Sequence, residues 1–132
     1  MENTQELYNT FLVKGESGMK AAERLIATAE EQVGNLGKRS NAQLNDFKAN
    51  TGGRFNKFAW DLDALGDFYN SKKQGFDWCD VFVDWCFIAT FGRGAAQKLL
   101  CQSDKSCGAG TGYSINYYYS RKIIYMASSI KT

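Results

Sequence analysis

The first clear pattern of apolar and polar positions lies in residues 19–33 and has a helical period. Apolar side chains recur there at spacings of three and four, so they share one face of a helix. The members of this face are Ala22, Leu25, Ile26, Ala29 and Val33. We therefore predict a helix over Met19–Val33 that turns this face to the core. Ser17 is placed to cap its start, and Gly34 and Gly37 follow its end.

Three more helices are expected, over Asn56–Leu65, Trp78–Phe91 and Ala95–Cys101. In the first of these, Phe58, Leu62 and Leu65 share a face and are expected to point inward. Gly92-Arg93-Gly94 separates the second helix from the third, because glycine interrupts a helical pattern.

Between these helices the chain is polar and rich in turn residues. Residues 35–57 read as a long loop that holds a short helical piece at Ala42–Lys48. Asn70–Gly75 is expected to be a second loop. Near the C-terminus the pattern indicates a helix over Tyr113–Tyr119 and a strand over Ile123–Met126.

These elements fit a single, mainly α-helical domain. The chain has 132 residues and is 44% hydrophobic, which is enough apolar material for a core. We expect an N-terminal extension over residues 1–18, a domain over residues 19–119 and a divergent C-terminal tail over residues 120–132.

The charge balance argues against two classes of partner. Sixteen basic and 14 acidic side chains give a net charge of +2, and the two signs are mixed locally. We therefore expect binding neither to nucleic acid nor to a membrane surface. No segment has the apolar length of a transmembrane helix, and the N-terminus lacks the features of a secretory signal. These features predict cytoplasmic synthesis without a signal peptide, so that any action at a cell wall would follow release by lysis.

The absence of histidine narrows the chemistry. It removes the commonest general base and the commonest metal ligand, and it excludes a cysteine–histidine pair within this chain. The cysteines are Cys79, Cys86, Cys101 and Cys107, and no two have the Cys-x-x-Cys spacing of a zinc site. We expect no metal and no cofactor, and we interpret Cys86 and Cys101 as small buried hydrophobic residues.

Cys79 differs from the other cysteines because it lies in the first turn of a predicted apolar helix. Unpaired backbone N–H groups and the helix dipole favour an anion at that place. The thiolate of Cys79 should therefore be stabilised, which makes the side chain a better nucleophile near neutral pH. A cysteine at the start of a buried helix, aimed into a cleft, is what a papain-like hydrolase requires.

The rest of this helix predicts its orientation. Phe82, Val83 and Cys86 follow Cys79 on one face and are expected to anchor the helix to the core. Asp80 and Asp84 are four residues apart and are expected to form a polar stripe on another face.

The run Trp78-Cys79-Asp80-Val81-Phe82-Val83 resembles the Trp-Cys-Ala-x-Phe-Val motif of CHAP domains. These domains belong to the NlpC-like and papain-like peptidoglycan hydrolases of phages and gut bacteria. Further segments resemble the family in the same order along the chain: Glu30-Glu31-Gln32-Val33-Gly34, Lys38-Arg39-Ser40-Asn41, Asn56–Leu62, Phe91-Gly92 and Gly108-Ala109-Gly110. The resemblance covers roughly residues 19–119.

The resemblance implies the helical half of a papain-like α+β domain and a cysteine amidase or endopeptidase, as in phage endolysins. Its substrate would be peptidoglycan or the stem peptides of peptidoglycan. Cys79 matches the family's nucleophile, and Cys86 matches a non-catalytic core position. Candidates to line the substrate cleft are Asn41, Asn45, Asn56, Lys57 and Trp78. The alternatives are solvated loop positions for the polar residues and core packing for Trp78.

The chain departs from the family after Tyr119. The family continues into a β-sheet that carries a catalytic histidine, whereas residues 120–132 do not match that pattern. We therefore expect a truncated or degenerate hydrolase that is inactive alone. One alternative is a non-catalytic wall-binding or interaction module that exposes an apolar face, forms homo-oligomers, and includes Phe91, Tyr113 and Tyr117-Tyr118-Tyr119 in that face. Another is a second chain that supplies the strands and the histidine.

Overall fold

A computed structural model describes residues 18–49, 52–100 and 108 of the chain. These residues form four α-helices and one 3₁₀ turn: α2 (Gly18–Glu30), η1 (Asn41–Gln43), α3 (Lys57–Ala64), α4 (Cys79–Phe91) and α5 (Arg93–Leu99). The described part contains no strand, only an isolated antiparallel bridge between Lys38 and Phe55. The prediction of a mainly α fold is thus confirmed there. The expected elements at 113–119 and 123–126, the tail and residues 1–17 lie outside the described residues.

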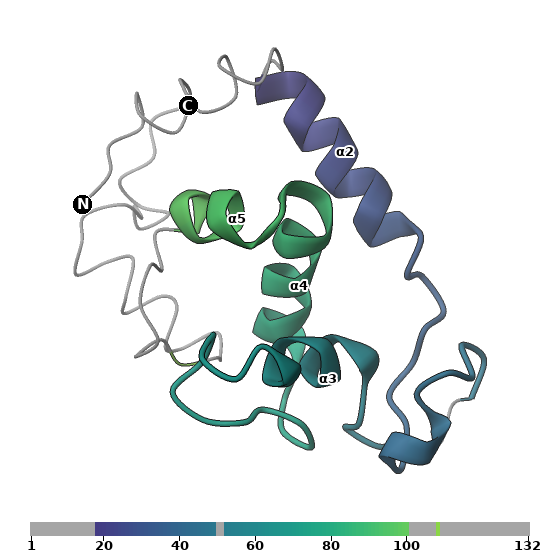
Figure 1. Cartoon of the computed structure of the whole chain (residues 1–132). Helices are drawn as coiled ribbons and strands as arrows, with labels where there is room; N and C mark the ends of the chain where they lie inside the picture. Colours follow the sequence, from purple (N-terminus) through teal and green to yellow (C-terminus); the bar gives the residue numbers. More distant parts are fainter. Residues whose placement is uncertain (1–17, 50–51, 101–107, 109–132) are drawn as a thin grey trace, which may run out of the picture.

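Helix α4 occupies the centre of this arrangement (Figure 1). Each of the other three α-helices packs against it. In Figure 1, α2 runs along one side of α4, α3 crosses the end where α4 begins, and α5 turns back from the end where α4 stops. The helix that carries Cys79 is therefore the element around which the described fold is built.

Local signals explain where α3 and α4 begin and end. Asn56 caps α3, because its Oδ1 accepts a hydrogen bond from the backbone N–H of Ala59 at 2.7 Å. Gly92 stops α4 with a φ of 83°, a conformation that glycine adopts without strain. The predicted bounds of both helices are close to those observed. Helix α5 begins two residues before the predicted Ala95.

The predicted inward face of the first helix is wrong in part. Val33 is 77% exposed because α2 ends at Glu30, so the helical period no longer sets its direction. Ile26 is also exposed. The inward side of α2 instead includes Ala21, which is buried. It also includes Thr28, whose hydroxyl accepts a hydrogen bond from Thr90 of α4 at 2.8 Å.

The core lies where α3, α4 and the loop after α3 meet. Its buried members are Phe58, Ala59, Leu62, Phe68, Tyr69 and Val81. Phe58 is the central ring: it stacks on Trp78 at 5.6 Å and meets Phe82 and Trp85 edge to face. Leu65, which was expected to point inward, is exposed because it is the C-cap residue of α3.

The long loop between α2 and α3 is held by Lys38. This side chain is 1% exposed, and its Nζ donates to the carbonyl oxygens of Phe47 and Ala49 at 3.1 and 2.6 Å. The backbone N–H of Lys38 donates to the Phe55 carbonyl oxygen, and the Lys38 carbonyl oxygen accepts from the Phe55 N–H. The helical piece expected at Ala42–Lys48 is shorter than predicted, a single turn at η1.

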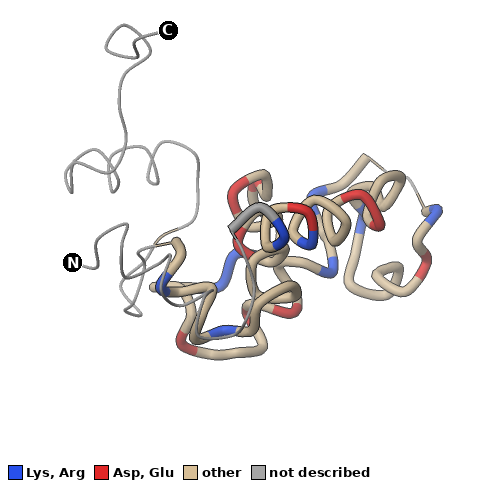
Figure 2. Tube along the Cα trace, turned by 90° about the horizontal axis from the view of Figure 1, so that it is seen from above, with Lys and Arg blue, Asp and Glu red and all other residues tan. Residues whose placement is uncertain are grey.

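Basic and acidic residues are interspersed along the described chain (Figure 2). Among the helices of the described residues, none combines the length and the apolar character that crossing a bilayer demands.

Candidate functional site

Cys79 is the first residue of α4, and its side chain is exposed. The first intrahelical hydrogen bond runs from the Phe82 N–H to the Trp78 carbonyl oxygen at 2.9 Å. The N–H groups of Cys79 and Val81 therefore precede the first hydrogen bond of the helical ladder. Cys79 thus lies in the first turn of α4, where the sequence placed it, and its thiol is accessible to solvent.

The expected orientation of α4 is only partly correct. Cys86 is buried, and Phe82 is half-buried against α3, but Val83 is exposed like Cys79. Asp84 is the opposite of what was expected, since it is buried beside Val81 rather than part of a polar stripe. The face of α4 that enters the core therefore runs through Val81, with Phe82, Trp85 and Ile88 packed beside it.

An apolar groove adjoins the start of α4. Its volume is about 450 Å³. Its apolar lining comes from Ala29, Val33, Leu36, Phe58, Trp78 and Phe82. Trp78 directly precedes Cys79. Phe82 lies four residues after Trp78, one helical turn further along α4. The groove thus lies at the end of α4 where Cys79 is found, but Cys79 itself does not line it.

The predicted substrate-binding residues are not brought together at this groove. Trp78 lines it, but Asn56 is buried and is used in capping α3. Lys57 is half-buried, with Nζ 4.8 Å from the centre of the Trp85 ring. Asn41 is exposed at the start of η1.

Asn41 and Asn56 are linked through a third amide, that of Gln74. Gln74 Nε2 donates to Asn41 Oδ1 at 2.8 Å and to the Asn56 carbonyl oxygen at 3.0 Å. The backbone N–H of Asn56 donates in return to Gln74 Oε1 at 3.1 Å. These bonds join η1, the start of α3 and the loop before α4 into one polar cluster.

A buried acid–phenol pair lies on the other side of α4. Tyr69 Oη donates to Asp84 Oδ2 at 2.5 Å, and Asp84 is 1% exposed. Burial raises the pKa of Asp84 to about 7, the Tyr69 hydrogen bond opposes that rise, and the charge of Asp80 adds to it. Burial, followed by the charge of Asp84, raises the pKa of Tyr69 far above its ordinary value.

Asp84 is not placed to deprotonate Cys79, although a buried carboxyl with a raised pKa is a frequent catalytic base. The two residues are five positions apart on a helix, so their side chains point about 140° apart. Asp84 is also sealed from solvent while Cys79 is open to it. Its environment therefore fits a structural role.

The remaining cysteine of the described part behaves as expected. Cys86 is buried, and burial raises the pKa of its thiol to about 11. Cys101 and Cys107 lie outside the described residues. No group of three or more acidic or cysteine side chains in the described ranges is arranged to hold a metal ion.

Sequence reasoning missed two residues of interest, Gln74 and Trp60, and it placed Asp84 on a polar face although Asp84 is buried. Gln74 is 33 positions from Asn41, and only the tertiary fold brings them together. Trp60 is 51% exposed on α3. A signal for it existed, because helical spacing places Trp60 beside Asp63 rather than beside the buried Phe58 and Leu62.

Comparisons with family models, with curated proteins and with solved structures found no match to this chain. The resemblance to CHAP domains consequently depends on the quoted motifs alone, and the function that it implies is a proposal.

Proposed function

We propose that this chain is a nucleophile-bearing, CHAP-like part of a cysteine peptidoglycan hydrolase, and that it does not hydrolyse peptidoglycan unaided. The observation that carries the proposal is the exposed Cys79 thiol on the first residue of α4, the helix that every other described α-helix contacts. The resemblance of residues 78–83 to the family's nucleophile motif adds support. The apolar groove at the same helix end offers a place for substrate.

The chemistry follows from what the helix start supplies and what the sequence lacks. A base removes the thiol proton, the Cys79 sulfur bonds to the carbonyl carbon of a peptide or amide, and the N–H groups at the helix start stabilise the oxyanion. The same group then protonates the departing amine as the C–N bond breaks, and water hydrolyses the thioester.

The chain contains no histidine, so this acid–base group has to come from elsewhere. A positioned acid–base group contributes about 10²–10⁴-fold in rate. Its absence is why we expect no measurable hydrolysis by the chain alone.

Chemical rescue by imidazole tests the proposal. Imidazole titrates near neutral pH as the histidine side chain does, and the exposed Cys79 thiol is accessible to it. We expect imidazole to promote release of new amino groups from purified cell walls by the wild-type chain and by Cys86→Ala, but not by Cys79→Ser. Equal release by Cys79→Ser, or full activity without imidazole, would contradict the proposal. Failure of imidazole to promote any release by the folded wild-type chain would also count against it.

The apolar groove favours a second candidate, a non-catalytic module that binds the cell wall or another protein. Two of the residues that line it, Val33 and Leu36, are exposed apolar side chains. Under this alternative, wall pull-down would be unchanged by Cys79→Ser and reduced by Val33→Asp. Retention of wall binding by Val33→Asp would remove the support that the groove gives.

A further inference from the structure

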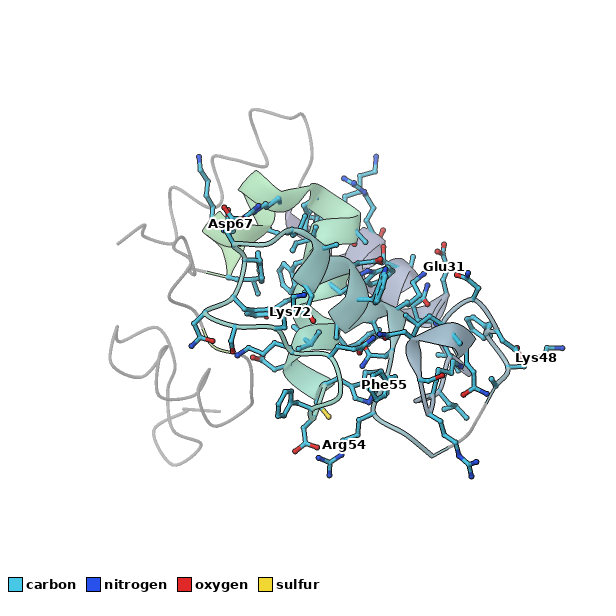
Figure 3. All side chains as sticks on the ribbon, turned by 60° about the horizontal axis from the view of Figure 1, so that its bottom comes forward. Glu31, Lys48, Arg54, Phe55, Asp67 and Lys72 are labelled. Carbon is cyan, nitrogen blue, oxygen red and sulfur yellow. The ribbon has the colours of Figure 1, made fainter. Side chains whose placement is uncertain are left out.

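A second cavity lies between η1, α3 and the loop that precedes α4. Its volume is about 200 Å³. It is lined by Asn41, Trp60, Asp63, Ala64, Lys72 and Gln74. Neither Cys79 nor the groove residues line it. In Figure 3, Lys72 lies near the middle of the view and Arg54 lies at the lower edge of the molecule.

Trp60 supplies an aromatic wall to this cavity. The chain has three tryptophans, and the other two pack on the core ring of Phe58: Trp78 stacks on it, and Trp85 meets it edge to face. Trp60 instead keeps half of its surface exposed and lies on the same helix face as Asp63 and Ala64. A large exposed aromatic side chain beside a cavity is a feature of ligand sites.

The polar rim of the cavity is held in place before any ligand arrives. Asp63 accepts hydrogen bonds from the backbone N–H groups of Lys73 and Gln74, at 2.8 and 3.0 Å, one to each carboxylate oxygen. The Gln74 amide is fixed in turn by Asn56, and it holds Asn41 Oδ1. Fixing Asn41 Oδ1 also sets the direction of its Nδ2 group, which retains two hydrogens for donation. Binding therefore requires little ordering of this rim.

The combination matches one ligand class. A hexopyranose ring has a face of C–H groups, which are attracted to the negative face of an aromatic ring, and a rim of hydroxyls, which both donate and accept hydrogen bonds. The cavity offers the indole ring of Trp60, the amide donor of Asn41 and the carboxylate of Asp63. One carboxylate, Asp63, and one ammonium, Lys72, balance in charge, so the site favours a neutral ligand.

We propose that this cavity is a saccharide subsite that binds one neutral hexopyranose ring, with Trp60 as its stacking platform and Asn41 as its oriented donor. The proposal goes beyond the proposed function, because it needs no reaction at Cys79. A glycan subsite would serve a hydrolase and a non-catalytic wall-binding module equally.

An NMR titration of the full chain with cellotetraose and with chitotetraose tests it. We expect saturable shifts of the Trp60 indole N–H and the Asn41 side-chain amide with at least one of the two, at millimolar affinity. Trp60→Ala should abolish saturation, and Asn41→Ala should weaken binding about tenfold, the effect of losing one hydrogen bond. Phe76→Ala is the matched control, because Phe76 is an aromatic side chain that is 63% exposed and does not line the cavity.

Three outcomes would overturn the proposal: no saturable shift with either saccharide, unchanged affinity in Trp60→Ala, or equal loss of affinity in Phe76→Ala. If Trp60→Ala also disturbs core resonances, Trp60→Phe decides the matter, since it should retain part of the affinity through its ring. Because Cys79 is intact in every variant, wall hydrolysis and saccharide binding can each fail without the other.

Discussion

Removing the charge of Asp84 should stabilise the protein at alkaline pH. The carboxyl is 1% exposed, and its single hydrogen bond among the described residues comes from Tyr69. Its pKa is about 7 in the folded state, against an ordinary value of 3.8. A folded-state pKa above the unfolded value means that the folded protein binds the proton more tightly. The contribution of protonated Asp84 to the free energy of unfolding is therefore complete below about pH 4 and is lost as pH rises through about 7.

The size of this effect follows from the difference between the two pKa values. Each pH unit of difference corresponds to about 1.4 kcal/mol, so complete ionisation of Asp84 costs on the order of 4 kcal/mol. That is a large share of the ~5–15 kcal/mol that usually separates folded from unfolded protein. The carboxyl should consequently dominate the pH dependence of stability between pH 4 and pH 8.

Urea unfolding, followed by tryptophan fluorescence at several pH values, measures how the free energy of unfolding depends on pH. Asp84→Asn keeps the shape of the side chain and an acceptor for Tyr69, but it cannot ionise. We expect the stability of Asp84→Asn relative to wild type to rise by about 3–4 kcal/mol from pH 4 to pH 8. Asp77→Asn is the control: Asp77 is exposed and pairs only loosely with Arg54, at 3.4 Å, so its effect should stay within about 0.5 kcal/mol. A relative stability of Asp84→Asn that does not change with pH would refute the reasoning.

Three further substitutions test the Tyr69–Asp84 pair, the loop held by Lys38 and helix α5. Tyr69→Phe removes the hydroxyl that donates to Asp84, so it should lower the free energy of unfolding by about 1–3 kcal/mol at pH 8. The loss should be smaller in the Asp84→Asn background. A double-mutant cycle compares the two backgrounds, and equal losses would contradict the pairing. Gly53→Ala should destabilise the loop held by Lys38 by several kcal/mol, because the added Cβ would fall 1.9 Å from the Lys38 carbonyl oxygen. Gly94→Ala, which meets no atom within 4 Å and lies inside α5, should instead stabilise by about 0.5–1 kcal/mol, and thermal unfolding of the two variants separates these outcomes.

The sequence predicted the helices better than the faces they bury. The bounds of α3 and α4 follow from an asparagine cap and a glycine stop, which are local signals. Helix α4 carries apolar residues on all of its sides, so the hydrophobic period could not show which side enters the core. Asp84 therefore looked like a surface residue, although it is buried and accepts a hydrogen bond from Tyr69 in the interior. Its burial depends on a loop 15 residues away, which no local pattern specifies.

The candidate site shows the same division between local and tertiary information. The place of Cys79 at a helix start could be inferred from the residues that follow it, and the structure has it there. The substrate-binding role assigned to Asn56 did not anticipate its use as a helix cap. The cavity beside Trp60 could not be anticipated, because Asn41, Trp60 and Gln74 come from three separate segments.

Thiol labelling of the native protein most directly tests whether Cys79 is an open nucleophile at the start of α4. Iodoacetamide is added to the folded chain, and the extent of labelling at Cys79 and Cys86 is followed by peptide mass spectrometry. Cys79 should be alkylated in the native state, while Cys86 should react only after unfolding, because it is buried and its thiol has a pKa of about 11. Protection of Cys79 in the folded protein, or labelling of Cys86 at the same rate, would contradict the placement of the nucleophile.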